Sequence, residues 1–128
     1  MNDTSLFTIL LVEDNPAEAR LTKYCFKEYN ANIIVEHVTD GVEAMDYLYR
    51  KNKYENAIEP NIILLDLNLP RMDGMSVLEK IKNDEDLKGI PVIVFAISRN
   101  KEEIENIYEN MPTVTLSNPL IMTNSWTL

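Results

Sequence analysis

Three carboxylates stand directly after two apolar runs of this chain. Glu13 and Asp14 follow the run 6–12, and Asp66 follows the run 61–65. Short runs rich in Ile, Leu and Val are typical of strands buried on both faces of a sheet. Open parallel α/β sheets bind ligands outside the carboxyl ends of their strands, so we expect the three carboxylates to meet there. Carboxylates that meet repel one another unless a cation lies between them, and hard oxygen ligands suit Mg²⁺, so the pattern predicts a magnesium site.

The composition limits the class of protein that carries this site. With 128 residues the chain has the length of one domain and can bury a core. Its net charge of −9 argues against nucleic acid or an anionic membrane as a direct partner, because both attract basic surfaces. Cys25 is the single cysteine, no apolar stretch approaches the roughly 20 residues that cross a bilayer, and the N-terminus lacks the basic start of a secretory signal. We therefore expect a cytoplasmic protein.

Strand-like and helix-like segments alternate along the chain. Strands that alternate with helices of about 10–15 residues are typical of βαβ units, right-handed crossovers and a parallel sheet, so we predict an α/β fold. The predicted strands cover residues 6–12, 33–38, 61–66, 91–97 and 113–117. The predicted helices cover about 16–29, from a cap at Asp40 to about Lys51, from near Gly74 onward, and about 100–110.

The end of the chain departs from this pattern. Residues 111–128 contain no Asp, Glu, Lys or Arg, although 26% of the chain is charged. A surface helix needs a polar face, and short helices are marginal by themselves, so a fifth helix after Pro119 is expected to be short or absent. Two explanations of this uncharged tail stay open. One is a frame change or the loss of the last helix, and the other is a contact surface for a homodimer built on the sheet edge and Trp126.

The acidic clusters and the residues around them resemble the receiver domain of bacterial and archaeal two-component response regulators. The resemblance covers about residues 6–119, and we expect the whole chain, 1–128, to be a single receiver domain. Within the family the chain is most similar to single-domain regulators found with phytochrome-type histidine kinases, through Tyr47–Arg50 and the long stretch 52–60. The matching sequence words are ILLVEDNP at 9–16, DGVEA at 40–44, LLDLNLPRMDG at 64–74 and IPVIV at 90–94.

The resemblance implies a fold and a chemistry. The fold is a doubly wound, five-stranded parallel sheet in the flavodoxin-like order 2-1-3-4-5. Asp66 would be the phosphoacceptor, taking a phosphoryl group from a histidine kinase or a phosphotransfer protein, and the chain would signal by protein contact. The side chains of Glu13, Asp14 and Asp66 and the backbone carbonyl of Asn68 would bind Mg²⁺, which neutralises charge on the transferring phosphoryl group.

Three positions depart from the family pattern in the part of the site that senses the phosphoryl group. The family has Thr or Ser where this chain has Ala96, a Lys before a Pro where it has Asn118, and an aromatic switch residue where it has Thr115. A phosphoryl group on Asp66 carries about −2 charge, and a neutral amide bonds it more weakly than an ammonium does. We therefore expect phosphorylation at Asp66 with weakened coupling to a conformational switch.

Two other functions compete with the phosphorelay receiver. One is a pseudo-receiver, a protein-binding module that does not depend on phosphorylation, and the three departures from the family pattern are its evidence. The other is a magnesium phosphatase with an aspartyl nucleophile. Such enzymes resemble this site but carry a second aspartate two residues after the nucleophile, where this chain has Asn68. We therefore expect that the chain is not an enzyme.

Overall fold

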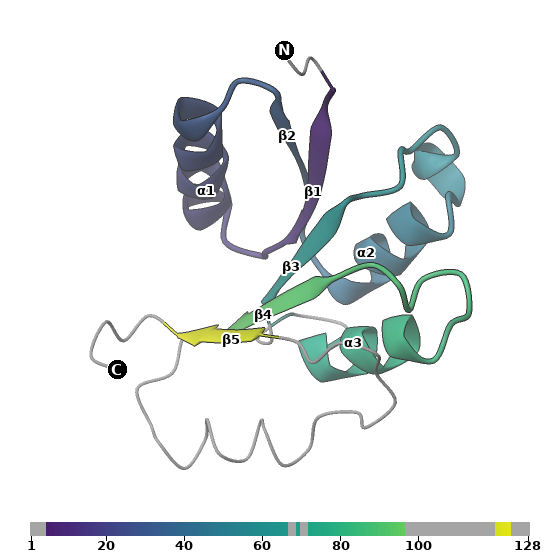
Figure 1. Cartoon of the computed structure of the whole chain (residues 1–128). Helices are drawn as coiled ribbons and strands as arrows, with labels where there is room; N and C mark the ends of the chain where they lie inside the picture. The colour runs from purple at the N-terminus through teal and green to yellow at the C-terminus, as the bar shows by residue number, and fades with distance from the viewer. Residues whose placement is uncertain (1–4, 67–68, 70–71, 97–119, 124–128) are drawn as a thin grey trace.

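A computed structural model describes residues 5–66, 69, 72–96 and 120–123 of the chain (Figure 1). Helices and strands alternate through most of this part, as the hydrophobic pattern predicts. The elements in chain order are β1 (Phe7–Val12), α1 (Pro16–Tyr29), β2 (Ile33–Val38), α2 (Gly41–Leu48), the 3-10 turn η1 (Asn52–Tyr54), β3 (Ile62–Asp66), α3 (Gly74–Lys82), β4 (Val92–Ala96) and β5 (Leu120–Thr123).

The strands β1 to β4 form a parallel sheet in the order β2-β1-β3-β4. In this sheet Val12 is level with Val38 of β2 and with Leu65 of β3. The carboxyl ends of the three strands therefore meet at one edge of the sheet. The predicted α/β class and this part of the predicted strand order are confirmed.

The segment β5 lies parallel to β4 at the far side of the sheet (Figure 1). The predicted fifth strand over 113–117 and the predicted helix over 100–110 lie outside the described residues. The complete order 2-1-3-4-5 therefore stays a prediction. No helix in the described ranges is both long enough and apolar enough to cross a membrane.

Both faces of the sheet are covered, which explains why its strands are apolar throughout. Helix α1 lies on one face and helices α2 and α3 lie on the other (Figure 1). Along β1, Ile9 and Leu11 belong to the core under α1, whereas Leu10 and Val12 belong to the core under α2 and α3. Successive side chains of a strand point to opposite faces, so a strand between two helical layers has no face left for polar residues.

A side chain caps the start of each α-helix in the described part of the chain. Asn15 Oδ1 accepts hydrogen bonds from the backbone N–H groups at the start of α1, at 2.9 and 3.2 Å. Asp40 caps α2 by accepting from Glu43 N–H, as predicted, and Asp73 caps α3 by accepting from Ser76 N–H, each at 2.8 Å. These caps satisfy N–H groups that have no partner within the helix.

The predicted end of the second helix at Lys51 is wrong, because α2 ends at Leu48. Arg50 and Asn52 adopt positive φ angles of 54° and 58°. This left-handed conformation ends a right-handed helix, and neither residue is the glycine that usually signals it in a sequence. The chain then turns through η1 and returns across the end of α2 (Figure 1).

Candidate functional site

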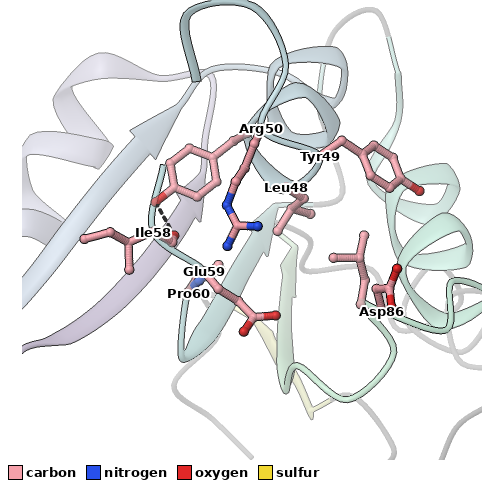
Figure 2. Close-up of a pocket in the computed structure, with 9 residues that line it drawn as sticks. Leu48, Tyr49, Arg50, Ile58, Glu59, Pro60 and Asp86 are labelled. Atoms are coloured by element: carbon pink, nitrogen blue, oxygen red, sulfur yellow. Dashed lines mark hydrogen bonds between the residues drawn. The ribbon is translucent and has the colours of Figure 1, made fainter. Parts of the chain in front are cut away.

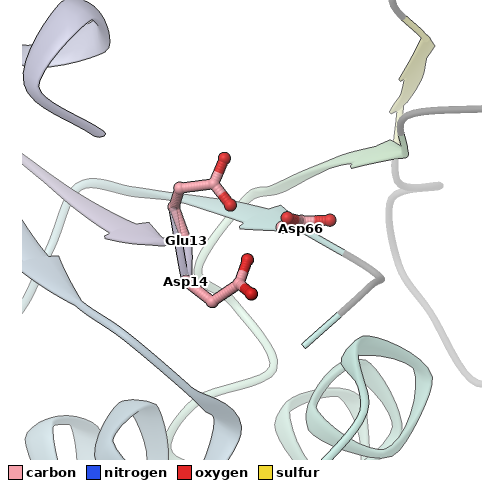
Figure 3. A group of neighbouring side chains, drawn as sticks. All are labelled: Glu13, Asp14 and Asp66. Carbon is pink, nitrogen blue, oxygen red and sulfur yellow. The ribbon is translucent and has the colours of Figure 1, made fainter. Parts of the chain in front are cut away.

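Glu13, Asp14 and Asp66 lie together at the carboxyl ends of β1 and β3. Each contributes a carboxylate oxygen, and these oxygens all lie within 4.8 Å of one another. Figure 3 shows the three side chains directed toward one shared space. Glu13 and Asp66 are buried, with exposed fractions of 3% and 2%, whereas Asp14 is exposed. The cluster therefore has two buried acids and one side open to solvent.

Backbone hydrogen bonds hold the turn that carries Glu13. The Glu13 N–H donates to the carbonyl oxygen of Val38 at 3.0 Å. His37 Nε2 lies 2.7 Å from the Glu13 carbonyl oxygen. A carbonyl oxygen can only accept, so His37 donates this hydrogen bond. Together with the Asn15 cap of α1, these bonds fix the backbone on both sides of Asp14.

Burial and repulsion between the acids raise the pKa of Glu13. Burial, the hydrogen bond with Asp66 and the negative charge of Asp66, in that order, raise the pKa of the Glu13 carboxyl to about 8. At neutral pH the Glu13 carboxyl therefore keeps its proton, which removes much of its repulsion with Asp66. A divalent cation does the same more strongly, because it carries two positive charges.

The chemistry of this oxygen donor set fits a hard divalent cation. Carboxylate oxygens are typical ligands of Mg²⁺, Mn²⁺ and Ca²⁺, and the described cluster contains no thiolate or imidazole that would favour a softer metal. Asp14 lies on the exposed side, so an ion can enter from solvent while keeping part of its water shell. Mg²⁺ usually keeps several waters when it binds proteins.

The remaining predicted site residues lie mostly outside the described part of the chain. Asn68, Thr115 and Asn118 are not among the described residues. Ala96 is the last residue of β4, next to the strand that carries Asp66, but its side chain lies outside the described part. The roles predicted for Asn68 and for the three departures from the family pattern therefore stay predictions.

A pocket that sequence reasoning missed lies at the opposite end of the sheet (Figure 2). Its volume is about 270 Å³. Arg50 Nε donates to the carbonyl oxygen of Ala57, and Tyr47 Oη donates to that of Ile58, both at 2.9 Å. These bonds tie the segment before β3 to the end of α2. Arg50 has a positive φ of 54°, which the sequence does not signal because the residue is not a glycine.

The chain matches the family profile of the response regulator receiver domain over residues 9–117. It therefore belongs to the receiver domains of two-component response regulators. Response regulator Rcp1 of Synechocystis is 45% identical over 101 residues, which span 79% of this chain and 69% of that protein. The prediction that the chain resembles phytochrome-associated regulators is confirmed by this relative and by two solved structures.

The first structure is the phosphorylated cyanobacterial phytochrome response regulator RcpA. It has a TM-score of 0.79 and 40% identity, and the match covers 96% of this chain and 84% of that chain. The second is the Mn²⁺-bound form of Rcp1, with a TM-score of 0.77 and 39% identity, covering 95% of this chain and 84% of that chain. One similar protein has thus been seen phosphorylated, and another with a divalent metal bound.

Proposed function

We propose that this receiver domain accepts a phosphoryl group on Asp66 from a histidine kinase or a phosphotransfer protein and signals by protein contact. The observation that carries the proposal is the position of Asp66. It ends β3, is almost fully buried, and lies beside Glu13 and Asp14 in a chain of the receiver family. The phosphorylated state of RcpA supports the proposal, since RcpA is 40% identical to this chain.

Mg²⁺ is the cation that we propose for the acidic cluster. The carboxylates of Glu13, Asp14 and Asp66 would hold it, together with the backbone carbonyl of Asn68, which lies outside the described residues. When bound, the ion neutralises charge on the transferring phosphoryl group and holds it in line with the attacking carboxylate. The Mn²⁺-bound form of Rcp1 supports a divalent ion in this family.

Asp66 supplies the nucleophilic oxygen in this reaction. One carboxylate oxygen forms a bond to phosphorus while the bond from phosphorus to the histidine nitrogen breaks, and the nitrogen keeps that electron pair. The product is an acyl phosphate on Asp66, and the transfer needs no oxidant or further reactant. Attack requires Asp66 as the carboxylate, and its neighbour Glu13, with its raised pKa, is the group that holds a proton.

We extend the proposal to the organisation of the chain. Residues 1–128 would form one receiver domain with the family's complete strand order, 2-1-3-4-5. The net charge of −9 supports a protein partner over nucleic acid or an anionic membrane, and a cytoplasmic location is the setting in which a histidine kinase would reach Asp66. A homodimer built on the sheet edge stays a prediction.

Intact-mass spectrometry after incubation with acetyl phosphate and Mg²⁺ tests the proposal. We expect a mass gain of one phosphoryl group, which disappears when EDTA replaces Mg²⁺. Asp66→Asn should abolish the gain because the nucleophile is lost. Asp86→Asn is the matched control, since Asp86 is an exposed aspartate at the opposite end of the sheet, and it should leave the gain unchanged. Modification of the Asp66→Asn variant to the wild-type extent would contradict the proposal.

The phosphorylation-independent binding module is the weaker hypothesis. It requires that the acidic cluster has lost its chemistry, yet the three carboxylates stay together with two of them buried. Burying acids without a chemical use costs stability, because each charge loses its hydration. A wild-type chain that gains no phosphoryl group in the experiment above would favour this hypothesis instead.

A further inference from the structure

The His37 side chain holds the peptide group that joins two of the acidic residues. Its Nε2 donates a hydrogen bond to the Glu13 carbonyl oxygen at 2.7 Å. That oxygen belongs to the peptide bond between Glu13 and Asp14. A peptide group is planar, so a hydrogen bond that fixes its oxygen also fixes the orientation of the whole plane. The bond therefore acts on the backbone of two of the three residues in the cluster at once.

This hydrogen bond lies just beyond the end of the pairing between β1 and β2. Val12 and Val38 are the last residues that the two strands pair. The Glu13 N–H still donates to the Val38 carbonyl oxygen, at 3.0 Å. The Glu13 carbonyl comes next along the chain, and a side chain of β2 is its partner. His37 thus extends the contact between the chain and β2 by one peptide group, to the point where the acidic cluster begins.

Helix α1 fixes the chain on the other side of the two acidic residues. Asn15 caps this helix, and its carbonyl oxygen accepts from the Ala19 N–H at 3.0 Å. His37 lies on the face of β2 that carries Ile33 and Val35, which both belong to the core under α1. The two acidic residues therefore form a short link between two fixed elements, and His37 holds the peptide in the middle of that link.

We infer that His37 is a positioning residue for the metal site. By fixing the peptide between Glu13 and Asp14, it sets the directions from which their carboxylates approach the ion. The inference rests on the proposed function, because it assumes that the acidic cluster binds Mg²⁺. His37 is not a member of the cluster and acts only through the backbone. The ion then meets ligands that are already oriented, which lowers the conformational cost of binding.

Removal and replacement of the donor test this inference. His37→Phe keeps an aromatic ring at this position and removes the donor. We expect Mg²⁺ to bind this variant about 10-fold more weakly, the lower end of the loss typical when a group that orients metal ligands is changed. His37→Gln is the rescue variant, because a glutamine amide nitrogen can take the place of Nε2 and donate the same bond. It should bind Mg²⁺ nearly as tightly as wild type.

Two further variants separate the hydrogen bond from other effects. His37→Asn carries the same amide on a side chain one carbon shorter, so its nitrogen does not reach the carbonyl oxygen. It should lose affinity as His37→Phe does. Val35→Ala is the matched control for stability, because Val35 is buried on the same face of β2 and its side chain has no donor. It should lower stability and leave Mg²⁺ affinity unchanged.

The affinities are measured by titrating Mg²⁺ into each folded variant and following the backbone amide resonances of residues 13–15. Urea unfolding without Mg²⁺ gives the stability of each variant separately. His37 is the single histidine of the chain, so its ring signals in nitrogen-15 spectra are assigned directly. We expect them to show a proton on Nε2 in wild type.

Each outcome gives a decision. If wild type binds Mg²⁺ and folded His37→Phe and His37→Asn bind it equally well, the positioning role is wrong and the proposed function stands. The role is also wrong if His37→Gln binds as weakly as His37→Phe, if Val35→Ala loses affinity to the same extent, or if Nε2 carries no proton. If none of the His37 variants folds, His37 serves the fold alone and the inference fails. If wild type itself does not bind Mg²⁺, the proposed function fails first and takes the inference with it.

Discussion

The proton on Glu13 governs how the site responds to pH. The pKa of Glu13 is raised to about 8, with burial as the largest cause and Asp66 as the next. Glu13 must lose this proton before it can act as a carboxylate ligand. Below about pH 8, protons therefore compete with the metal ion for the Glu13 carboxylate, and at higher pH this competition disappears.

We predict that Mg²⁺ affinity rises with pH and then levels off. Below the pKa of Glu13 the apparent dissociation constant should change about tenfold per pH unit, because one proton is released for each ion bound. Isothermal titration calorimetry between about pH 6 and pH 9 measures both the affinity and the proton release. In Glu13→Gln the steep pH dependence should vanish. An affinity that is constant across this range in wild type would contradict the raised pKa.

At the scale of elements, a polar network fastens η1 and the start of α2 together. The Glu43 carboxylate accepts hydrogen bonds from the hydroxyl groups of Thr39 and Tyr54, and Lys53 Nζ lies 3.4 Å from it. The rings of Tyr47 and Tyr54 also meet, with centroids 5.4 Å apart. Glu43 lies in the first turn of α2, so the network holds the start of this helix against η1.

Replacing Glu43 should show how much this network contributes to the free energy of unfolding. Hydrogen bonds from Thr39, Tyr54 and Lys53, in that order, lower the pKa of Glu43 from 4.5 to about 2. The carboxylate therefore stabilises the fold fully above pH 4.5, and the stabilisation is lost as the pH falls toward 2. We predict that Glu43→Gln costs about 1 kcal/mol at neutral pH and that its difference from wild type shrinks across this window.

Urea unfolding at a series of pH values measures this difference. Glu55→Gln is the matched control, because Glu55 is an exposed glutamate that lies just after η1. It should unfold like wild type over the same pH range. A Glu43→Gln deficit that does not change between pH 4.5 and pH 2 would show that the carboxylate charge is unimportant.

The local pattern of the sequence predicted most elements but not the contacts between them. The unbroken apolar run through Ile9–Val12 predicted a strand covered on both faces, because a strand with one solvent face needs alternating polar residues. The meeting of the Glu13, Asp14 and Asp66 carboxylates could also be predicted, because the carboxyl ends of parallel strands lie at the same edge of the sheet. The close contact of Gly41 with Met72 could not be predicted, because the two residues are distant in sequence and the contact depends on how α2 packs.

At the scale of the whole molecule, the core under α2 and α3 includes the strand residues that lead into the acidic cluster. It contains Val12 and Leu65, the residues that directly precede Glu13 and Asp66. Leu78 of α3 belongs to the same core and is fully buried. Tight packing of this layer keeps the strand ends, and so the carboxylates, at fixed positions.

Core truncation should therefore destabilise the chain without touching the site. We predict that Leu78→Ala lowers the free energy of unfolding by about 2–5 kcal/mol, because it removes buried methyl groups and leaves a cavity. Leu21→Ala is the matched control on α1, where the side chain is 63% exposed, and it should change stability by about 0.5 kcal/mol or less. Equal effects of the two substitutions in urea unfolding would contradict this layering of the core.

The central claim is that Glu13, Asp14 and Asp66 form a metal-dependent phosphoacceptor site. A crystal structure of the chain soaked with Mg²⁺ and a fluoride mimic of the phosphoryl group tests it most directly. The account predicts one Mg²⁺ in contact with all three carboxylates and the mimic attached to a carboxylate oxygen of Asp66. A metal bound elsewhere, or an unmodified Asp66 facing an empty cluster, would contradict it.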